Sequence, residues 1–256
     1  MKERILTLAV ETSSRIGSVA IALNGKLIGE TVFSSPLSHS AEIFPAIRVL
    51  LDQFNLKPSQ IEDVYVSGGP GSFTGLRIAT TIAKIMQLAN AVKIVTVDTL
   101  DVVAANVVNL IPDNSLIASN QKPPAISAER IAAVLDAKRG QFFIAVYEQD
   151  KDKEPKAAGR SIWRKILPDC LMTASQFLNR FTNDAKPIWL LGDGLLYYKD
   201  KFQADNVHFF DEKLWSPRAA KVLMLGHHMA LKEQFADALT LTPNYLRKPD
   251  VTIKTL

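Results

Sequence analysis

The feature that most constrains the fold of this chain is a glycine-rich turn that joins a strand-like segment to a helix-like segment. The turn lies after the β-rich run 64–67, and its eight residues are Gly68, Gly69, Pro70, Gly71, Ser72, Phe73, Thr74 and Gly75. Four glycines let the backbone adopt positive φ and approach other groups closely. A helix that begins here points backbone N–H groups and the positive end of its dipole toward the turn. The turn therefore either holds an anion or forms a sharp, rigid corner.

The spacing of the glycines narrows the anion-binding interpretation. The turn is not a P-loop, because it lacks the lysine followed by serine or threonine that ends the motif G-x-x-x-x-G-K-S/T. Residues 69–74 approach the dinucleotide-binding pattern G-x-G-x-x-G but lack its last glycine, and Asp98 ends the next strand. A dinucleotide-dependent oxidoreductase is therefore one alternative. The strand hairpins before the turn argue against it, because a dinucleotide-binding unit usually opens with its fingerprint.

Composition indicates a globular protein with room for one large or two modest cores, since 47% of the 256 residues are hydrophobic and 22% are charged. No apolar run approaches the roughly 20 residues that cross a bilayer. The first residues lead into a strand without the apolar core of a signal peptide. The single cysteine, Cys170, excludes an internal disulfide and fits a reducing compartment. We therefore expect a cytoplasmic protein without membrane contact.

The charge pattern gives no support for direct nucleic-acid binding by this chain alone. The net charge is +4, and lysines and arginines are scattered, with mild concentrations at 160–165 and 247–254. A nucleic-acid surface normally shows a basic stripe or interleaved aromatic residues.

Hydrophobic periodicity predicts an α/β protein. Asn24-Gly25 between two β-rich runs is a strong hairpin signal. Expected strands are 4–10, 17–23, 26–33, 63–67, 93–97, 128–136, 141–148, 161–167 and 187–191, and expected helices are 41–54, 74–89, 174–181 and 217–235. Three antiparallel strands followed by α-β-α-β resemble the half-domain of the fold shared by actin, sugar kinases and heat-shock chaperones. The later strands suggest a second, degenerate copy.

The expected division of the chain follows from this repeat. Residues 1–110 form the first half-domain, joined by helix 217–235; residues 111–216 form a smaller second one; and 236–256 form an extended tail. Segments 111–127 and 149–160 read as loops whose role the sequence leaves open.

Helices 41–54 and 74–89 carry more apolar surface than their own sheet can cover, because a surface helix needs only about a 100° apolar face. One interpretation is that the two helices cover each other's excess within one chain. The other is that they form half of an interface with another subunit. Small Ala79 and Ala83 would permit close helix approach, and Ala83→Arg is expected to abolish pairing without unfolding the chain. The candidate interface residues are Ile43, Ile47, Leu50, Leu51, Leu76, Ala79, Ile82, Ala83 and Met86.

The sequence offers no recognisable catalytic or metal-binding set. The four histidines do not form an H-x-x-x-H pair, which would place two ligands on one helix face; they are His39, His208, His227 and His228. Ser72 does not lie in a G-x-S-x-G nucleophile elbow. Cys170 has no nearby base and reads as a small apolar filler. We therefore predict no catalytic residue and no metal.

One enzymatic alternative remains open, a free-standing ATPase of the sugar-kinase type. Its basis is the acidic residues at expected strand ends, which are Glu11, Asp98, Asp136 and Asp193. The run Glu11, Thr12 and Ser13 offers a carboxylate and hydroxyls but lacks the glycine that lets backbone approach a phosphate. We interpret these three residues as a vestigial nucleotide-binding site.

A specific resemblance covers most of these observations. Residues 67–78 resemble the signature GPGSFTGLR block of the TsaB (YeaZ) family. Supporting blocks lie at 8–14, 38–45, 136–140, 192–194 and 243–247, and the resemblance is closest over 1–105. It implies two actin-like half-domains of the ASKHA, ribonuclease H-like type, each a mixed sheet flanked by helices. The glycoprotease (M22) label sometimes given to this family finds no support in these residues.

The resemblance also implies a function. Family members are scaffold or activator subunits that pair, through their first two helices, with a TsaD-type enzyme in threonylcarbamoyladenosine (t6A) modification of tRNA position 37. It implies a TsaE-type ATPase as a further partner, a homodimer when the chain is alone, and tRNA contact only through the complex. No cofactor of its own is expected, and ATP or ADP only at a subunit boundary.

Overall fold

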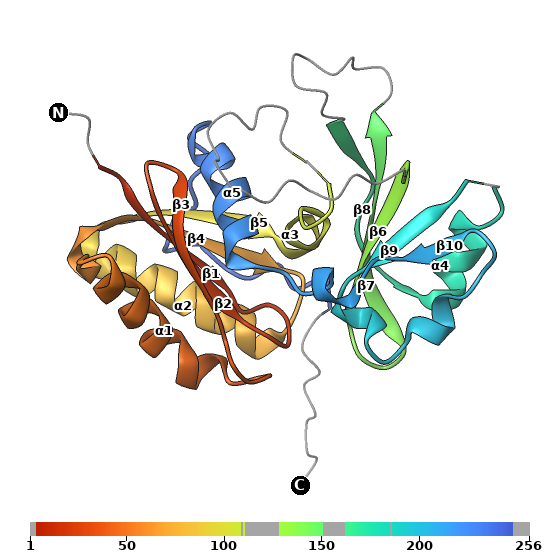
Figure 1. Ribbon diagram of the computed structural model, residues 1–256, viewed down its shortest axis with the longest axis horizontal. Helices are drawn as coiled ribbons and strands as arrows, with labels where there is room; N and C mark the ends of the chain where they lie inside the picture. The colour runs from red at the N-terminus through yellow and green to blue at the C-terminus, as the bar shows by residue number, and fades with distance from the viewer. Residues whose placement is uncertain (1–3, 109, 111–127, 151–161, 185, 248–256) are drawn as a thin grey trace, which may run out of the picture.

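The computed structural model describes residues 4–108, 110, 128–150, 162–184 and 186–247, and it contains two five-stranded sheets side by side (Figure 1). The strands of the first sheet are β1 (Leu6–Glu11), β2 (Ser18–Leu23), β3 (Lys26–Val32), β4 (Ile61–Gly69) and β5 (Lys93–Asp98). The strands of the second are β6 (Arg130–Asp136), β7 (Gln141–Asp150), β8 (Ile162–Thr173), β9 (Ile188–Leu191) and β10 (Val207–Phe209). The helices are α1 (His39–Gln53), α2 (Phe73–Asn90), α3 (Thr99–Ala104), α4 (Ala174–Phe181) and α5 (Ala219–Ala230).

The second sheet repeats the strand order of the first. The orders are β3-β2-β1-β4-β5 and β8-β7-β6-β9-β10. In each sheet three antiparallel strands are followed by a strand that pairs in parallel with the central strand, and by an edge strand that pairs in parallel with that fourth strand. The predicted α/β fold of two similar halves, each a mixed sheet flanked by helices, is therefore confirmed. We call the first sheet with α1, α2 and α5 the first lobe, and the second sheet with α4 the second lobe.

Alternation along β1 decides which helices cover which face of the first sheet. Leu6, Leu8 and Val10 pack in one cluster with α1 and α2, whereas Ala9 points to the opposite face and packs with α5. Figure 1 shows α1 and α2 on one side of this sheet and α5 on the other. Small residues on the α5 side allow close approach, because a Cβ on Gly226 of α5 would lie 2.7 Å from the ring of Tyr65.

Side chains of the first lobe satisfy the first backbone amides of α5. The amide of Ala219 donates to Ser18 Oγ at 2.8 Å, and that of Ala220 donates to Glu30 Oε1 at 3.1 Å. These amides have no partner inside the helix itself. The C-terminal helix is thus attached to the first lobe, although it follows the second lobe in the sequence.

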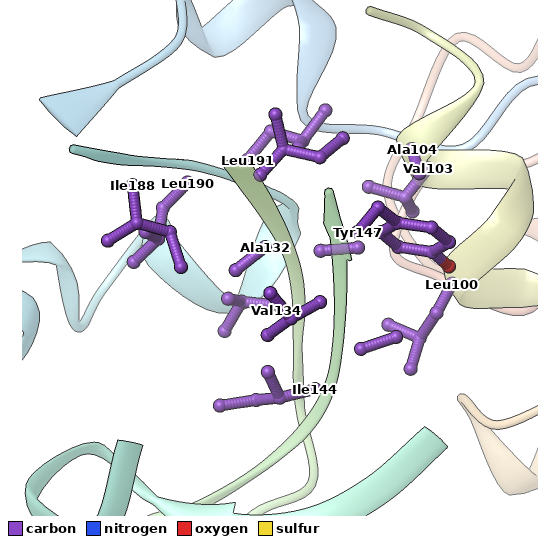
Figure 2. Close-up of a cluster of buried hydrophobic side chains, with 14 of the residues drawn as sticks. Leu100, Val103, Ala104, Ala132, Val134, Ile144, Tyr147, Ile188, Leu190 and Leu191 are labelled. Atoms are coloured by element: carbon purple, nitrogen blue, oxygen red, sulfur yellow. The ribbon is translucent and has the colours of Figure 1, made fainter. Parts of the chain in front are cut away.

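Helix α3 packs between the two sheets. Its Leu100, Val103 and Ala104 belong to the core of the second lobe, and Figure 2 shows Leu100 and Val103 next to Tyr147 of β7. Val102, on the opposite side of α3, packs with α5 and the first sheet. One short helix therefore contributes to both cores and fixes the lobes relative to each other.

The structure differs from the sequence-based expectations in four elements, of which one is β8, which continues to Thr173 where the expected strand ends at residue 167. Helix α3 and strand β10 were not expected, because six and three residues are too few to show a period. The predicted helix 217–235 ends at Ala230, where the chain turns at Glu233 with φ of +57° and Ala236 bridges to Ile94 of β5. Of the predicted loops and tail, residues 111–127, 151–160 and 248–256 lie outside the described residues, whereas Gln149 and Asp150 of the second predicted loop belong to β7. Within the described part, no helix has both the length and the apolar character of a membrane span.

Candidate functional site

The glycine-rich turn packs directly against the connection between β1 and β2. The amide of Ser72 donates to Ser13 O at 2.7 Å, and Thr12 Oγ1 donates to Gly75 O at 2.7 Å. A Cβ on Gly75 would lie 1.7 Å from Thr12 O, and one on Gly71 would lie 2.4 Å from Ser13 O. Two backbone segments therefore meet at a distance that only glycine permits. These contacts favour the rigid-corner interpretation over an anion-binding turn.

Glu11, at the end of β1, is enclosed behind this corner. Its Oε1 accepts hydrogen bonds from the amide (2.6 Å) and the hydroxyl of Ser13, and its Oε2 accepts one from the hydroxyl of Ser67. Burial raises the pKa of Glu11 despite these hydrogen bonds. Of the residues interpreted as a vestigial nucleotide site, Glu11 and Thr12 are buried without lining the cavity described next, and Ser13 lines its wall.

A cavity of about 590 Å³ lies between the lobes, next to the corner. The first lobe contributes Ser13, Arg15 and Phe73, and the second contributes the β6–β7 turn 136–139 and Asp193. The C-terminal segment 244–247 crosses between them: the amide of Asn244 donates to Gly68 O at 2.7 Å, and Arg247 donates to Ala137 O at 2.6 Å. This cavity is larger than the groove on the first lobe described below.

Asp193 is the buried carboxyl group of this cavity. It follows Gly192, whose φ of +125° and approach to Val134 O leave no room for a Cβ. Asp193 Oδ2 accepts a 3.4 Å hydrogen bond from the amide of Arg15, so the residue links the two lobes. Burial raises the pKa of Asp193 to about 6 from its usual 3.8.

We expect Asp193→Asn to remove a pH dependence of stability. The folded chain holds this proton more tightly than the unfolded chain, so the free energy of unfolding falls as the pH rises from 3.8 to about 6 and stays lower above. The variant should therefore be more stable than wild type at pH 7.5 by up to about 3 kcal/mol, and equal to it near pH 3.5. Urea unfolding at both pH values measures this, and an identical difference at both would refute it.

A separate acidic cluster connects the lobes on another side. Oxygen atoms of Asp98, Asp101 and Asp169 lie within 4.8 Å of one another. The ammonium group of Lys165 lies among them, 2.6 Å from Asp101 Oδ1 and 2.7 Å from Asp169 Oδ1. Burial acts to lower the pKa of Lys165, but the carboxylates outweigh burial and raise it. Asp98, the acidic residue of the dinucleotide interpretation, thus belongs to an ion-pair network in which a lysine supplies the cation.

Helices α1 and α2 enclose an apolar groove of about 410 Å³ on the outer face of the first lobe. Phe44 of α1 and Ile85 of α2 stand at its walls with 63% and 55% of their surface exposed, and Leu88 of α2, farther along the helix, is 79% exposed. Ile43 and Ile82 lie at its floor and are buried. The expected apolar excess on these helices is therefore present at the surface of the chain.

The list of candidate interface residues predicted from the sequence needs correction. Seven of them are buried within the chain and form the core beneath the helices: Ile43, Leu50, Leu51, Leu76, Ala79, Ile82 and Ala83. Ile47 and Met86 are half-buried. The i, i+4, i+7 stripe marks the face that each helix turns to its own sheet, and the excess lies outside that stripe, as at Phe44, Ile85 and Leu88. Because Ala83 is fully buried, the expectation that Ala83→Arg leaves the fold intact is wrong.

The histidines and the cysteine occupy separate places. His39 is buried at the start of α1, with Nε2 2.8 Å from Ser14 O. His227 of α5 lies against Gly25 of the first hairpin, and burial lowers its pKa. Cys170 is half-buried on β8, with Sγ 3.5 Å from Ile144 O. None of the three lines the inter-lobe cavity.

Comparison with known proteins gives consistent matches over nearly the whole chain. A family model described as TsaD, tRNA N6-adenosine threonylcarbamoyltransferase, matches residues 34–255. The tRNA threonylcarbamoyladenosine biosynthesis protein TsaB of Bacillus subtilis is 24% identical over 250 residues, covering 96% of each chain. The protein of the same name from Escherichia coli is 26% identical over 240 residues, covering 94% of each.

A solved structure supports the fold. YeaZ from Pseudomonas aeruginosa superposes with a TM-score of 0.71 at 22% identity, covering 94% of this chain and 99% of that chain. The two-lobed arrangement of this chain is therefore that of the YeaZ structure.

Proposed function

The chain belongs to the TsaB (YeaZ) family of tRNA threonylcarbamoyladenosine biosynthesis proteins, within the group that the TsaD family model describes, and on this premise we propose that it is a non-catalytic subunit that activates a TsaD-type transferase. The observation that carries the proposal is the apolar groove between α1 and α2. Exposed apolar patches of this kind mark association sites.

The interior of the inter-lobe region favours a supporting role over chemistry. The amide of Ser72 donates a hydrogen bond to Ser13 O. The carboxylate of Glu11 accepts hydrogen bonds from Ser13 and Ser67. Catalysis needs donors and bases that face a substrate. The dinucleotide-dependent oxidoreductase and the free-standing ATPase are therefore not favoured.

The proposed mechanism is organisational. Pairing would cover Phe44 and Ile85, and the free energy of that burial would favour the partner conformation in which its active site is ordered. When the chain is alone, a second copy would cover the same groove, so homodimer and heterodimer compete. A TsaE-type ATPase would join the assembled pair, with ATP or ADP held only at a subunit boundary, in the cytoplasm.

Reconstitution tests the proposal. The TsaD-type enzyme of the same organism, supplied with a threonylcarbamoyl donor and tRNA, is expected to form t6A at least about 100-fold more slowly without this chain, a loss of roughly 3 kcal/mol of activation free energy. The chain alone should form none. Nucleoside mass spectrometry gives the rates. Full activity of the enzyme in the absence of the chain would remove the proposed role.

A further inference from the structure

Cationic side chains that are scattered in the sequence converge at the inter-lobe cavity. Arg15 follows β1, Lys138 and Arg139 form the β6–β7 turn, and Arg247 belongs to the C-terminal segment; all four line the cavity. Its acidic lining residues are Asp136, which pairs with Lys138 at 2.7 Å, and the buried Asp193. The cavity therefore carries an excess of positive charge.

Aromatic rings stand on both sides of the same cavity. Tyr197 of the second lobe is 68% exposed, and the guanidinium carbon of Arg15 lies 5.1 Å from its ring centroid. In the first lobe, Phe73 is 42% exposed and its centroid lies 5.1 Å from that of Tyr245. Exposed rings beside arginine side chains are the surfaces on which unpaired nucleic-acid bases stack.

The packing at the glycine-rich corner favours a nucleic-acid strand over a free nucleotide as the anion that the inter-lobe cavity binds. A free nucleotide is usually held by a cluster of backbone amides around its phosphates. Here the amide of Ser72 donates its hydrogen bond to Ser13 O, and the backbone of residues 12–13 fills the space next to Gly71 and Gly75. The positive charge instead lies on long side chains spread around the cavity. Such spacing suits phosphates placed one by one along a strand.

We propose that the inter-lobe cavity binds a single-stranded segment of RNA, with a base stacked on Tyr197 and neighbouring phosphates on Lys138 and Arg139. This inference rests on the proposed function, which makes tRNA the RNA at hand. It assigns this chain a direct contact with the substrate of the complex.

Fluorescence anisotropy with a labelled single-stranded oligoribonucleotide of about 12 nucleotides, within the length range such sites cover, tests the proposal on the full chain and on its pair with the TsaD-type enzyme. Tyr197→Ser should weaken binding at least about fivefold, the low end of the cost of one lost base stack, and Tyr197→Phe should retain it. Replacing Lys138 and Arg139 by alanine should reduce the slope of log K against log salt concentration by about 1.4, because each of the two lost phosphate contacts on a single strand contributes about 0.7. Lys213→Ala is the matched control, since Lys213 is exposed outside the cavity.

Three outcomes would overturn the inference: no binding by either the chain or the pair, equal binding by Tyr197→Ser and wild type, or displacement of the RNA by equimolar AMP or ATP, which would indicate a mononucleotide site. If the chain still stimulates the transferase in those cases, the proposed function stands and only the RNA contact fails. If it does not stimulate the transferase, the proposed function fails whatever the RNA result.

Discussion

Ile85→Glu is expected to abolish co-elution of this chain with the TsaD-type enzyme while leaving its own fold intact. Ile85 stands at the wall of the α1–α2 groove with more than half of its surface exposed, so glutamate is tolerated in the free chain. In a complex the carboxylate would be buried without a partner. Central interface residues cost about 2–4 kcal/mol when lost, so pairing should weaken roughly 30- to 1000-fold. Phe44→Glu, on the facing helix, should weaken pairing to a similar extent.

Size-exclusion chromatography measures the pairing, and the unfolding midpoint of each variant reports its fold. The matched control is Leu239→Glu, because Leu239 is 86% exposed yet lies outside the groove. This control should pair as wild type does. Wild-type co-elution of both Ile85→Glu and Phe44→Glu would exclude the α1–α2 groove as the pairing surface.

Gly75→Ala is expected to destabilise the chain by at least about 3 kcal/mol, because the new methyl group would overlap the carbonyl oxygen of Thr12 at 1.7 Å. Neither backbone segment can move away easily, since Thr12 Oγ1 is hydrogen-bonded to Gly75 O. Urea unfolding gives the free energy.

The control for this effect is Gly140→Ala in the β6–β7 turn. Gly140 has a φ of +72° and nothing within 4 Å of an added Cβ, so only the cost of a left-handed backbone applies, about 1–2 kcal/mol. Equal losses at Gly75 and Gly140 would show that close contact with Thr12 is not what requires glycine at position 75.

Local signals in the sequence predicted most of the fold. The hairpin at Asn24-Gly25 is confirmed, with φ of +50° and +75° at the two residues, because turn chemistry is encoded within a few positions. The strand, glycine turn and helix around residues 61–90 are confirmed for the same reason. Helix α3 was missed because it has only six residues and because these divide between two cores, so no one-sided pattern marks it as a helix.

The candidate sites were less predictable because they depend on which face each helix turns inward. The sequence identified the two helices with surplus apolar surface but selected the buried stripe, such as Ala79 and Leu51, over the exposed Phe44 and Ile85. The positive charge of the inter-lobe cavity could not be predicted for a related reason. Its cationic side chains come from three segments that are far apart in the sequence, and only the fold brings them together.

The initial rate of threonylcarbamoyl transfer, followed as this chain is titrated into a fixed amount of the TsaD-type enzyme, tests most directly whether the chain acts by pairing through α1 and α2. The rate should rise to a plateau at one chain per enzyme, and Ile85→Glu should require far more protein to reach the same plateau. A rate that does not depend on the chain, or a titration curve that Ile85→Glu leaves unchanged, would contradict this function.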